Sequence, residues 1–311
     1  MPLDFATSCW FLTGPTAAGK TSVGIELAKR LDAEIVSMDS MALYRGMDIG
    51  TAKPSLAERA AVPHHLVDCL EPHEQCSLAQ YMQVAEEAAR SILKAGKQVL
   101  FVGGTPLYLK GLLRGIFEGP PADWEFRRAL QAEAAEREPG WLHSRLSAVD
   151  PVAASKLHVN DARRLIRALE VHHKTGRPIS EWQRQFDIGR AADACRVFVL
   201  EWPRGELHAR IDRRVDEMFA SGLVEEVRRL LGSAERLSRT AAQAVGYKEV
   251  IEHLEGQRDL PATVALVQQH TRQLAKRQMT WFRSLSECRS VPMSTAASPD
   301  EVAAGILDAG L

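Results

Sequence analysis

The segment from Gly14 to Thr21 constrains the fold of this 311-residue chain more than any other segment does. Its residues are Gly14, Pro15, Thr16, Ala17, Ala18, Gly19, Lys20 and Thr21, which fit the phosphate-binding P-loop pattern Gly-x-x-x-x-Gly-Lys-Thr. An apolar run over 9–13 predicts a buried strand before the loop, and an amphipathic run over 22–31 predicts a helix after it. Because such a loop presents backbone N–H groups at a helix N-terminus, it attracts anions. We therefore expect a di- or triphosphate site, with Lys20 neutralising the terminal phosphate and Thr21 binding Mg²⁺.

Composition excludes several classes of protein. Hydrophobic residues make up 45% and charged residues 25% of the chain, as in ordinary globular proteins, and the net charge is -1. Any surface that binds RNA must therefore be local. The five cysteines include no C-x-x-C pair, so neither a zinc site nor a redox pair is indicated. Without a signal peptide or an apolar run of the roughly 20 residues that span a bilayer, we expect a cytoplasmic enzyme with no membrane partner.

A second predicted strand, over 34–38, ends in Asp39 and Ser40. In parallel α/β sheets ligands bind at the carboxyl ends of the strands, so Asp39 should project toward the phosphate site. A turn or helix-capping aspartate is the alternative interpretation. Because two consecutive strand ends point to one place, we favour a catalytic or metal-linked role.

The apolar run over 98–102 predicts a central parallel strand. It ends in Gly103 and Gly104, where an ATPase would often carry the aspartate that holds Mg²⁺ through water. We expect these glycines to let a large acceptor pass close to the backbone. Another short strand is expected at Leu66–Val67.

The alternation of strands and helices stops after the Gly-Pro-Pro segment at 119–121. Residues from about 123 to 186 are almost wholly helical in pattern, and strand character returns at 196–200. The expected fold is an α/β, P-loop NTPase-like parallel sheet flanked by helices, interrupted by an all-helical insertion domain. The expected boundaries are 1–117 and 196–311 for the catalytic core and 118–195 for the insertion.

Arg210 and Arg214 lie four positions apart on a predicted helix that starts near 204. Such a pair can direct two guanidinium groups at one anion. It can equally form ion pairs with Asp212 and Glu206, and the sequence leaves both alternatives open.

Arg163 and Arg167 have the same spacing on a predicted helix of the insertion. A solvated charged face is the usual meaning of such a pattern. A further predicted helix over 271–283 carries four basic residues, no acids and two aromatic residues at its end. This composition suits contact with phosphodiesters, or cations lent to an active site.

Taken together, these blocks resemble the tRNA dimethylallyltransferases of bacterial type, also called tRNA isopentenyltransferases. The resemblance runs from the P-loop to Arg283. Besides the P-loop, the matching segments are Asp39-Ser40-Met41, 44–54, Gly103-Gly104-Thr105, Asn160-Asp161 with Arg164 and Arg167, Val245-Gly246-Tyr247 and 272–278. The blocks from Asp39 to Pro54 and from Arg272 to Arg283 are the most specific.

The resemblance implies that the P-loop holds the pyrophosphate of dimethylallyl diphosphate and not a nucleotide. The acceptor is then an adenine at position 37 of the tRNA anticodon loop, flipped out of its stack. Its exocyclic N6 attacks C1 of the prenyl group and pyrophosphate leaves. The helical insertion would grip the anticodon stem, Mg²⁺ would be the cofactor, and we take a monomer as the default state.

The resemblance also implies roles for individual residues. Asp39 would accept the proton of N6, while Lys20, Thr21 with Mg²⁺, and Arg214 before Arg210 would stabilise the leaving group. The implied tRNA contacts are Asp39, Ser40, Met41, Ala42, Thr105, Asp123, Arg163, Arg164, Arg167, Gln243, Gly246, Lys248, Arg272 and Lys276.

Three alternatives remain beside this hypothesis. A small-molecule P-loop kinase would hold ATP in the loop and deprotonate a hydroxyl with Asp39, and an adenylate isopentenyltransferase would prenylate a free nucleotide. Neither needs the helical insertion. An RNA-binding protein with an inactive P-loop is disfavoured because Lys20, Thr21 and Asp39 are all present.

Overall fold

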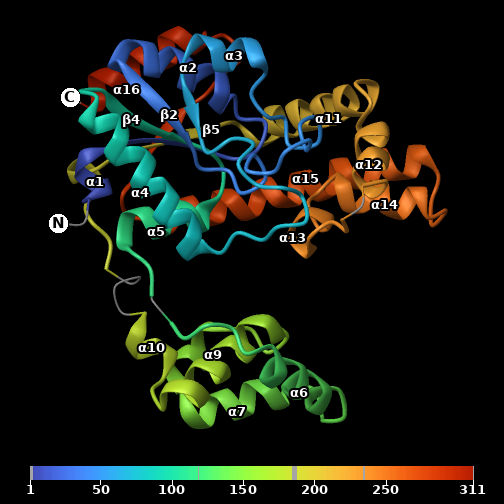
Figure 1. Ribbon diagram of the computed structural model, residues 1–311. Coiled ribbons are helices and arrows are strands. Elements are labelled where there is room, and N and C mark those ends of the chain that lie inside the picture. Colours follow the sequence, from blue (N-terminus) through green and yellow to red (C-terminus); the bar gives the residue numbers. More distant parts are fainter. Residues whose placement is uncertain (1–2, 118, 184–187, 234, 311) are drawn as a thin grey trace. The chain divides into compact units, whose positions relative to one another are not determined.

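The computed structural model describes residues 3–117, 119–183, 188–233 and 235–310, and the chain divides into two compact units (Figure 1). The catalytic unit comprises residues 1–113 and 189–311, and the helical unit comprises 114–188. The helical unit thus starts and ends a few residues earlier than the 118–195 expected from the sequence. The later boundary moves because Cys195 is buried in the core of the catalytic unit, where Arg289 donates hydrogen bonds to the carbonyls of Ala192 and Cys195.

One sheet of six parallel strands forms the centre of the catalytic unit, in the order β3-β2-β4-β1-β5-β6. The strands are β1 Trp10–Thr13, β2 Ala33–Ser37, β3 His64–His65, β4 Gln98–Val102, β5 Arg196–Glu201 and β6 Cys288–Pro292. The predicted α/β class is confirmed, as is the interior parallel position of β4. The strand expected at Leu66–Val67 is wrong: it lies two residues earlier, and the left-handed φ of 58° at Leu66 turns the chain out of the sheet.

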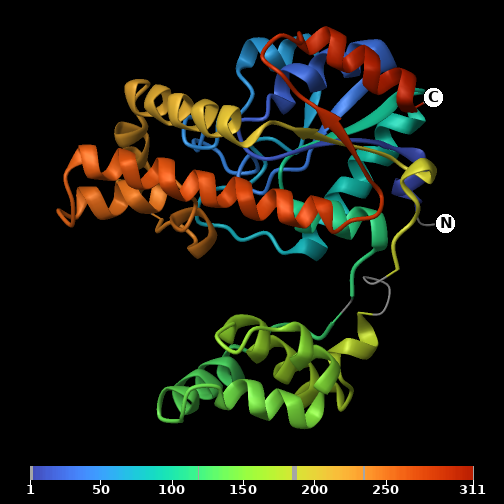
Figure 2. The ribbon, with the colours of Figure 1, turned by 180° about the vertical axis from the view of Figure 1, so that it is seen from behind.

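Side chains of each strand alternate between two apolar layers, which is why the strands are almost continuously apolar. Phe11 and Phe101 lie in the layer covered by α1 (Phe5–Ser8), α4 (Leu78–Lys94) and α5 (Pro106–Arg114). Trp10, Leu12 and Leu100 lie in the opposite layer, covered by α2 (Lys20–Leu31), the start of α11 (Arg204–Ala220) and α16 (Pro299–Gly310). Figures 1 and 2 show these helices on the two faces of the sheet.

Beyond the carboxyl ends of the strands, α11 packs along α15 (Leu260–Arg283), as both views show. The helix predicted over 271–283 is the second half of α15, which begins at Leu260 after the capping residue Asp259. The smaller helices here are α12 Leu223–Leu231, α13 Arg239–Ala242 and α14 Tyr247–Leu254, which share an apolar cluster that includes Tyr44, Met47, Val227 and Tyr247. Elsewhere in this unit, α3 Leu56–Ala61 precedes β3 and the 3-10 turn η2 Ala192–Ala194 precedes β5.

The helical unit contains α6 Trp124–Ala135, α7 Trp141–Val149, α8 Pro151–Lys156, α9 Ala162–Thr175 and α10 Ile179–Trp182. Asp123, Asp150 and Asp161 cap the N-termini of α6, α8 and α9 with their side chains, so these helices begin where capping satisfies free N–H groups. Leu130, Leu146 and Leu165 belong to its separate core. No helix in the described part of the chain has the length and apolarity to cross a membrane.

Candidate active site

The P-loop connects β1 to α2, as predicted from its pattern. Gly14 and Gly19 have φ angles of 148° and 88°, a region that side-chain-bearing residues avoid. A Cβ at Gly14 would also lie 2.9 Å from the carbonyl oxygen of Leu200. The two glycines therefore allow the tight loop, and Lys20 begins the helix that follows it.

Lys20 is the cation at the centre of the loop. Its Nζ donates hydrogen bonds to the carbonyl oxygens of Gly14 (3.1 Å) and Pro15 (2.8 Å). Burial lowers the pKa of Lys20 to about 8, against the opposing attraction of Asp39, and the nearby charge of Arg214 lowers it further. A bound anion would reverse this effect, because it would favour the charged ammonium.

Arg210, on α11, donates a hydrogen bond to the P-loop backbone. Its Nε donates to the carbonyl of Ala17 (2.9 Å), and its guanidinium stacks 4.2 Å from the ring centroid of Trp202. Trp202 itself donates from Nε1 to the carbonyl of Ala18 (2.9 Å). Carbonyl oxygens that would repel a phosphate are thus occupied by protein donors.

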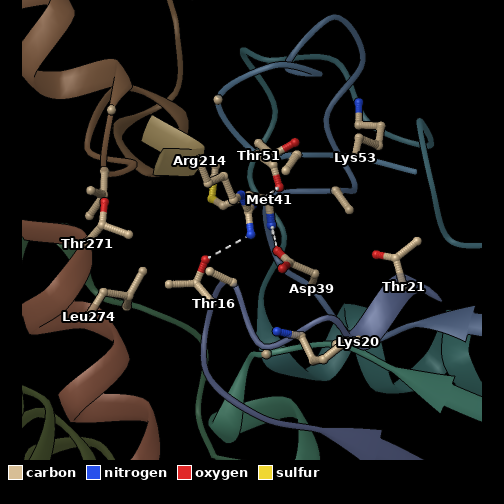
Figure 3. A pocket seen from close by; sticks show the side chains of 18 of the residues that line it. Thr16, Lys20, Thr21, Asp39, Met41, Thr51, Lys53, Arg214, Thr271 and Leu274 are labelled. Carbon is tan, nitrogen blue, oxygen red and sulfur yellow. Dashed lines mark hydrogen bonds between the residues drawn. The ribbon is translucent and has the colours of Figure 1, made fainter. Parts of the chain in front are cut away.

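Arg214 reaches over the other end of the loop (Figure 3). Its Nη1 donates to the hydroxyl of Thr16 (3.3 Å) and its Nη2 to the carbonyl of Thr51 (3.5 Å). Its Nε is buried and has no hydrogen-bond partner among the described residues. Burial lowers the pKa of Arg214, although the charge of Asp39 opposes this shift. A buried guanidinium with an unused donor is suited to binding an anion.

The structure excludes one of the two alternatives for this arginine pair, the ion pairs with Asp212 and Glu206. Asp212 forms its ion pair with Arg272 of α15, and Glu206 makes no hydrogen bond to Arg210 or Arg214. Within the described residues, neither arginine has a carboxylate in ion-pair contact. Two unneutralised guanidinium groups therefore flank the P-loop.

Asp39 follows the end of β2, at the carboxyl edge where the sequence places it. One carboxylate oxygen accepts the N–H of Met41 (2.8 Å), and the N–H of Ser40 donates to the hydroxyl of Thr105 (3.0 Å). Figure 3 shows Asp39, Lys20 and Arg214 around one cavity. Thr105, expected as an RNA contact, thus also holds the loop that carries Asp39.

The glycines after β4 have a packing role in the protein itself. A Cβ at Gly103 would lie 2.1 Å from the backbone of Met38, and one at Gly104 would lie 2.8 Å from Nε2 of Gln278. Packing against the Met38 backbone therefore requires glycine at position 103, whereas at position 104 a Cβ would displace only the tip of the Gln278 side chain. That these glycines also let a large acceptor pass close to the backbone stays a prediction.

The cavity has a volume of about 740 Å³ and brings together most of the predicted residues of the catalytic unit. Those in its lining are Thr16, Ala17, Ala18, Gly19, Lys20, Thr21, Asp39, Ser40, Met41, Ala42, Thr105, Arg210, Arg214, Gln243 and Gly246. Gly14, Pro15 and Lys248 lie outside this lining. Lys248 is half exposed and 3.7 Å from Glu252.

Arg272 and Lys276 line a second cavity, of about 540 Å³, on another face of α15. Arg272 is held there by Asp212, and Arg283 by Glu201. The prediction treated the basic residues of this helix as one group. Because a helix turns by about 100° per residue, they point in different directions, and of the four only Arg277 lines the main cavity.

Further residues complete the main cavity. Lys53, which the sequence left open as a phosphate contact or a surface charge, comes from the 44–54 loop together with Thr51. Thr271, Leu274 and Gln278, which the sequence did not assign to the site, come from α15. Figure 3 shows Thr271 and Leu274 on the cavity side of that helix. Their spacing of three and four residues, continued to Gln278, is a helical stripe that the sequence displays but that its basic residues obscured.

In the helical unit, Arg167 supports the fold. Glu170 is fully buried and accepts hydrogen bonds from Arg127, the Asp123 amide and Arg167. Burial raises the pKa of Glu170, but these hydrogen bonds outweigh burial and lower it to about 2. Asp123 serves this structure as well, because its side chain caps α6.

The other two arginines of α9 are more exposed. Arg164 pairs with Asp161, its capping residue, although its side chain keeps 67% of its surface exposed. Arg163 is exposed and has no ion-pair or hydrogen-bond partner among the described residues. Arg163 is therefore the arginine of this set that is free to contact an RNA phosphate.

A metal site built wholly from protein is absent from the described residues, which contain no cluster of three or more His, Cys, Asp or Glu able to hold an ion. Thr21, at the start of α2, lines the cavity near Lys20 (Figure 3). Mg²⁺ bound to phosphates commonly takes few protein ligands and completes its shell with water. The site therefore fits a Mg²⁺ ion that enters with a diphosphate.

Comparison with known proteins identifies the family. Residues 42–285 match the family model described as IPP transferase, and residues 7–68 match that described as isopentenyl transferase. A tRNA dimethylallyltransferase of Rhodopirellula baltica is 48% identical over 93% of this chain and 89% of its own length. The full-length tRNA isopentenylpyrophosphate transferase of Bacillus halodurans has a TM-score of 0.70 at 35% identity, over 97% of this chain and 96% of its own. A eukaryotic dimethylallyltransferase acting on tRNA has a TM-score of 0.76 at 26% identity, covering 96% of this chain and 76% of its own. This chain is similar along nearly its whole length to these tRNA-modifying enzymes. It therefore belongs to the IPP transferase family.

Proposed function

We propose that this protein transfers a dimethylallyl group from dimethylallyl diphosphate to N6 of an adenine in the tRNA anticodon loop, releasing pyrophosphate. One observation carries the proposal: a single cavity holds the P-loop, two arginines without carboxylate partners and the carboxylate of Asp39. A diphosphate leaving group and a proton-bearing nucleophile need these opposite kinds of group side by side. The relatives named above support tRNA as the acceptor.

The cationic side of the cavity serves the leaving group. When the bond between C1 and the bridging oxygen breaks, the electron pair goes to pyrophosphate, whose negative charge grows. Lys20 and the unused Nε of Arg214 offer donors for that charge, and Arg210 offers its terminal nitrogens beside Gly19. Arg214 is the stronger candidate of the two arginines because it is more deeply buried, where charge is less screened.

Asp39 serves the nucleophile. As N6 forms its bond to C1, it must lose one proton, and a carboxylate placed at the cavity wall accepts it. The Met41 amide fixes the orientation of this carboxylate. The products are the N6-prenylated adenine, pyrophosphate and the proton on Asp39.

Thr21 is the residue proposed to hold Mg²⁺. When bound, the ion would neutralise charge on the leaving pyrophosphate, as divalent ions do in diphosphate chemistry.

The helical unit is proposed to bind the anticodon stem, with Arg163 and Arg164 as its exposed cations. Ser40, Met41, Ala42, Gln243 and Gly246, which line the cavity, are proposed to surround the target adenine. We propose a monomer that acts in the cytoplasm, where its tRNA substrate is found.

The experiment is transfer of labelled dimethylallyl diphosphate in the presence of Mg²⁺. The expected result is label on N6 of an adenine in the anticodon loop of a tRNA, with none on a matched tRNA that lacks adenines in that loop. Label on AMP but not on tRNA would instead identify a nucleotide prenyltransferase. ATP turnover without prenyl transfer would identify a kinase or ATPase and overturn the proposal.

A further inference from the structure

Gln278 is a buried amide in the second half of α15, only 9% exposed. Its Oε1 accepts a hydrogen bond from the backbone N–H of Thr16 in the P-loop, at 2.9 Å. Its Nε2 donates to the carbonyl oxygen of Gly104, after β4, at 2.7 Å. A single side chain thus bonds two loops that lie far apart in the sequence.

The second loop leads directly to Asp39. Gly104 is followed by Thr105, whose hydroxyl accepts the N–H of Ser40, and Asp39 in turn accepts the N–H of Met41. The backbone N–H of Thr105 also donates to the carbonyl of Met38 (3.2 Å). The Asp39 segment and the Gly104 segment are therefore joined on both sides of Asp39.

The chemistry of this position selects an amide. The P-loop offers an N–H and the β4 end offers a C=O, so the linking group must accept one hydrogen bond and donate another. A carboxylate lacks the donor and would place negative charge beside the diphosphate. Gly104 leaves the space that the amide occupies, since a Cβ there would approach Nε2 to 2.8 Å.

We propose that Gln278 is a positioning residue that holds the P-loop and the Asp39 loop in a fixed position relative to each other. It thereby sets where the reacting carbon of the donor lies relative to the base. This inference rests on the proposed function for its kinetic consequences, but its binding consequence, a preorganised diphosphate site, stands on the hydrogen bonds alone.

Two variants disturb this link in different ways. Gln278→Met keeps the length of the side chain and removes both hydrogen bonds. Gly104→Ala keeps the amide but displaces its tip, which a flexible side chain tolerates without unfolding the protein. Gln83→Met is the matched control, because Gln83 is exposed on α4 of the same unit and bonds only to Glu87 among the described residues.

The measurements are steady-state kinetics with donor and tRNA varied separately, calorimetric binding of inorganic pyrophosphate with Mg²⁺, and thermal unfolding. For Gln278→Met we expect kcat/KM for the donor to fall about 10- to 100-fold, because two buried backbone groups lose their hydrogen-bond partner. The KM for tRNA should not change. Pyrophosphate binding should weaken at least about tenfold. Gly104→Ala should shift the same parameters in the same direction, and Gln83→Met none of them.

The outcomes separate the two proposals. A raised KM for tRNA with an unchanged KM for the donor would make Gln278 an RNA contact and overturn the inference. Unchanged donor kinetics and unchanged pyrophosphate binding would reduce it to a packing residue and also overturn it. If the unmodified protein transfers no prenyl group to tRNA, the proposed function fails, while pyrophosphate binding to the variants still decides whether Gln278 orders the P-loop.

Discussion

Two arginine pairs with the same spacing lie in the two units of this protein. Arg163 and Arg167 are four positions apart on α9, and Arg210 and Arg214 are four positions apart on α11. On α9, the guanidinium of Arg167 binds the buried carboxylate of Glu170. On α11, neither guanidinium has a carboxylate in ion-pair contact within the described residues.

The difference shows that the partner, and not the spacing, decides what an arginine pair does. A buried carboxylate neutralises Arg167 and makes it part of the fold of the helical unit. Asp212 lies between Arg210 and Arg214 in sequence, but Arg272 binds it, so the two arginines beside the P-loop have no ion-pair partner among the described residues. Burying such a charge is costly, and a bound anion offsets that cost. The comparison therefore predicts that the α11 pair acts on catalysis, whereas Arg167 of the α9 pair acts on stability.

Replacement of Arg214 should have the largest effect on activity. For Arg214→Gln we expect kcat/KM for dimethylallyl diphosphate to fall about 10²- to 10³-fold, the usual loss when a donor to developing charge is removed. Stability should not fall, because the variant removes a buried charge that lacks an ion pair. Steady-state kinetics and thermal unfolding measure both. A destabilised variant with normal turnover would mean that Arg214, like Arg167, supports the fold and not catalysis.

The pH dependence of donor binding should report on Lys20, another cation of the P-loop site. Since burial lowers the pKa of Lys20 to about 8, the free enzyme loses this cation as pH rises through that value. The KM for the donor should then rise up to about tenfold per pH unit above pH 8, until the higher pKa of the complex is reached. Lys20→Met should bind the donor weakly but without this rise. A flat profile in the unmodified enzyme would mean that Lys20 stays charged.

The sign for stability is opposite to that for binding. The pKa of Lys20 is lower in the folded protein than its ordinary 10.5, so between about pH 8 and 10.5 the unfolded chain binds more protons. The contribution of Lys20 to the free energy of unfolding therefore increases with pH across this window. Urea unfolding of the unmodified protein and of Lys20→Met at several pH values isolates this contribution.

Replacement of Arg167 should have the smallest effect on chemistry. Arg167→Ala leaves buried Glu170 with fewer donors, and we expect the helical unit to lose about 1–3 kcal/mol of unfolding free energy. Donor KM should be unchanged. Arg163→Ala is the matched control on the same helix: it should leave unfolding unchanged and raise the Kd for tRNA a few-fold. Equal stability of the two variants would mean that the hydrogen bond from Arg167 to Glu170 does not stabilise the helical unit.

Local sequence patterns predicted much of this molecule because their physics is local. The P-loop, its flanking strand and helix, β4 and the position of Asp39 after β2 all follow from short runs of residues. The change from alternating elements to helices alone likewise revealed the helical unit. Its C-terminal boundary lies earlier than expected, because residues near 189–195 are held by contacts with Glu287 and Arg289, nearly a hundred positions away.

Long-range contacts account for what the sequence did not reveal. The partner of Asp212 is 60 positions away, and the groups that explain Gly103 and Gly104 lie on β2's end and on α15. The stripe of Thr271, Leu274 and Gln278 was visible as a period, but only the fold shows which face of α15 meets the cavity. Contacts between residues far apart in the sequence, unlike helical periodicity, cannot be predicted from any short segment.

In the proposed reaction, Asp39 and the P-loop cations act on the same two substrates in one cavity. The decisive measurement is the rate of prenyl transfer to bound tRNA by Asp39→Asn, in a single-turnover rapid-quench assay. We expect the transfer rate to fall about 10²- to 10⁴-fold, with the affinities for pyrophosphate and tRNA nearly unchanged. A normal transfer rate, or a lost affinity for tRNA with an intact rate, would show that Asp39 is not the proton acceptor.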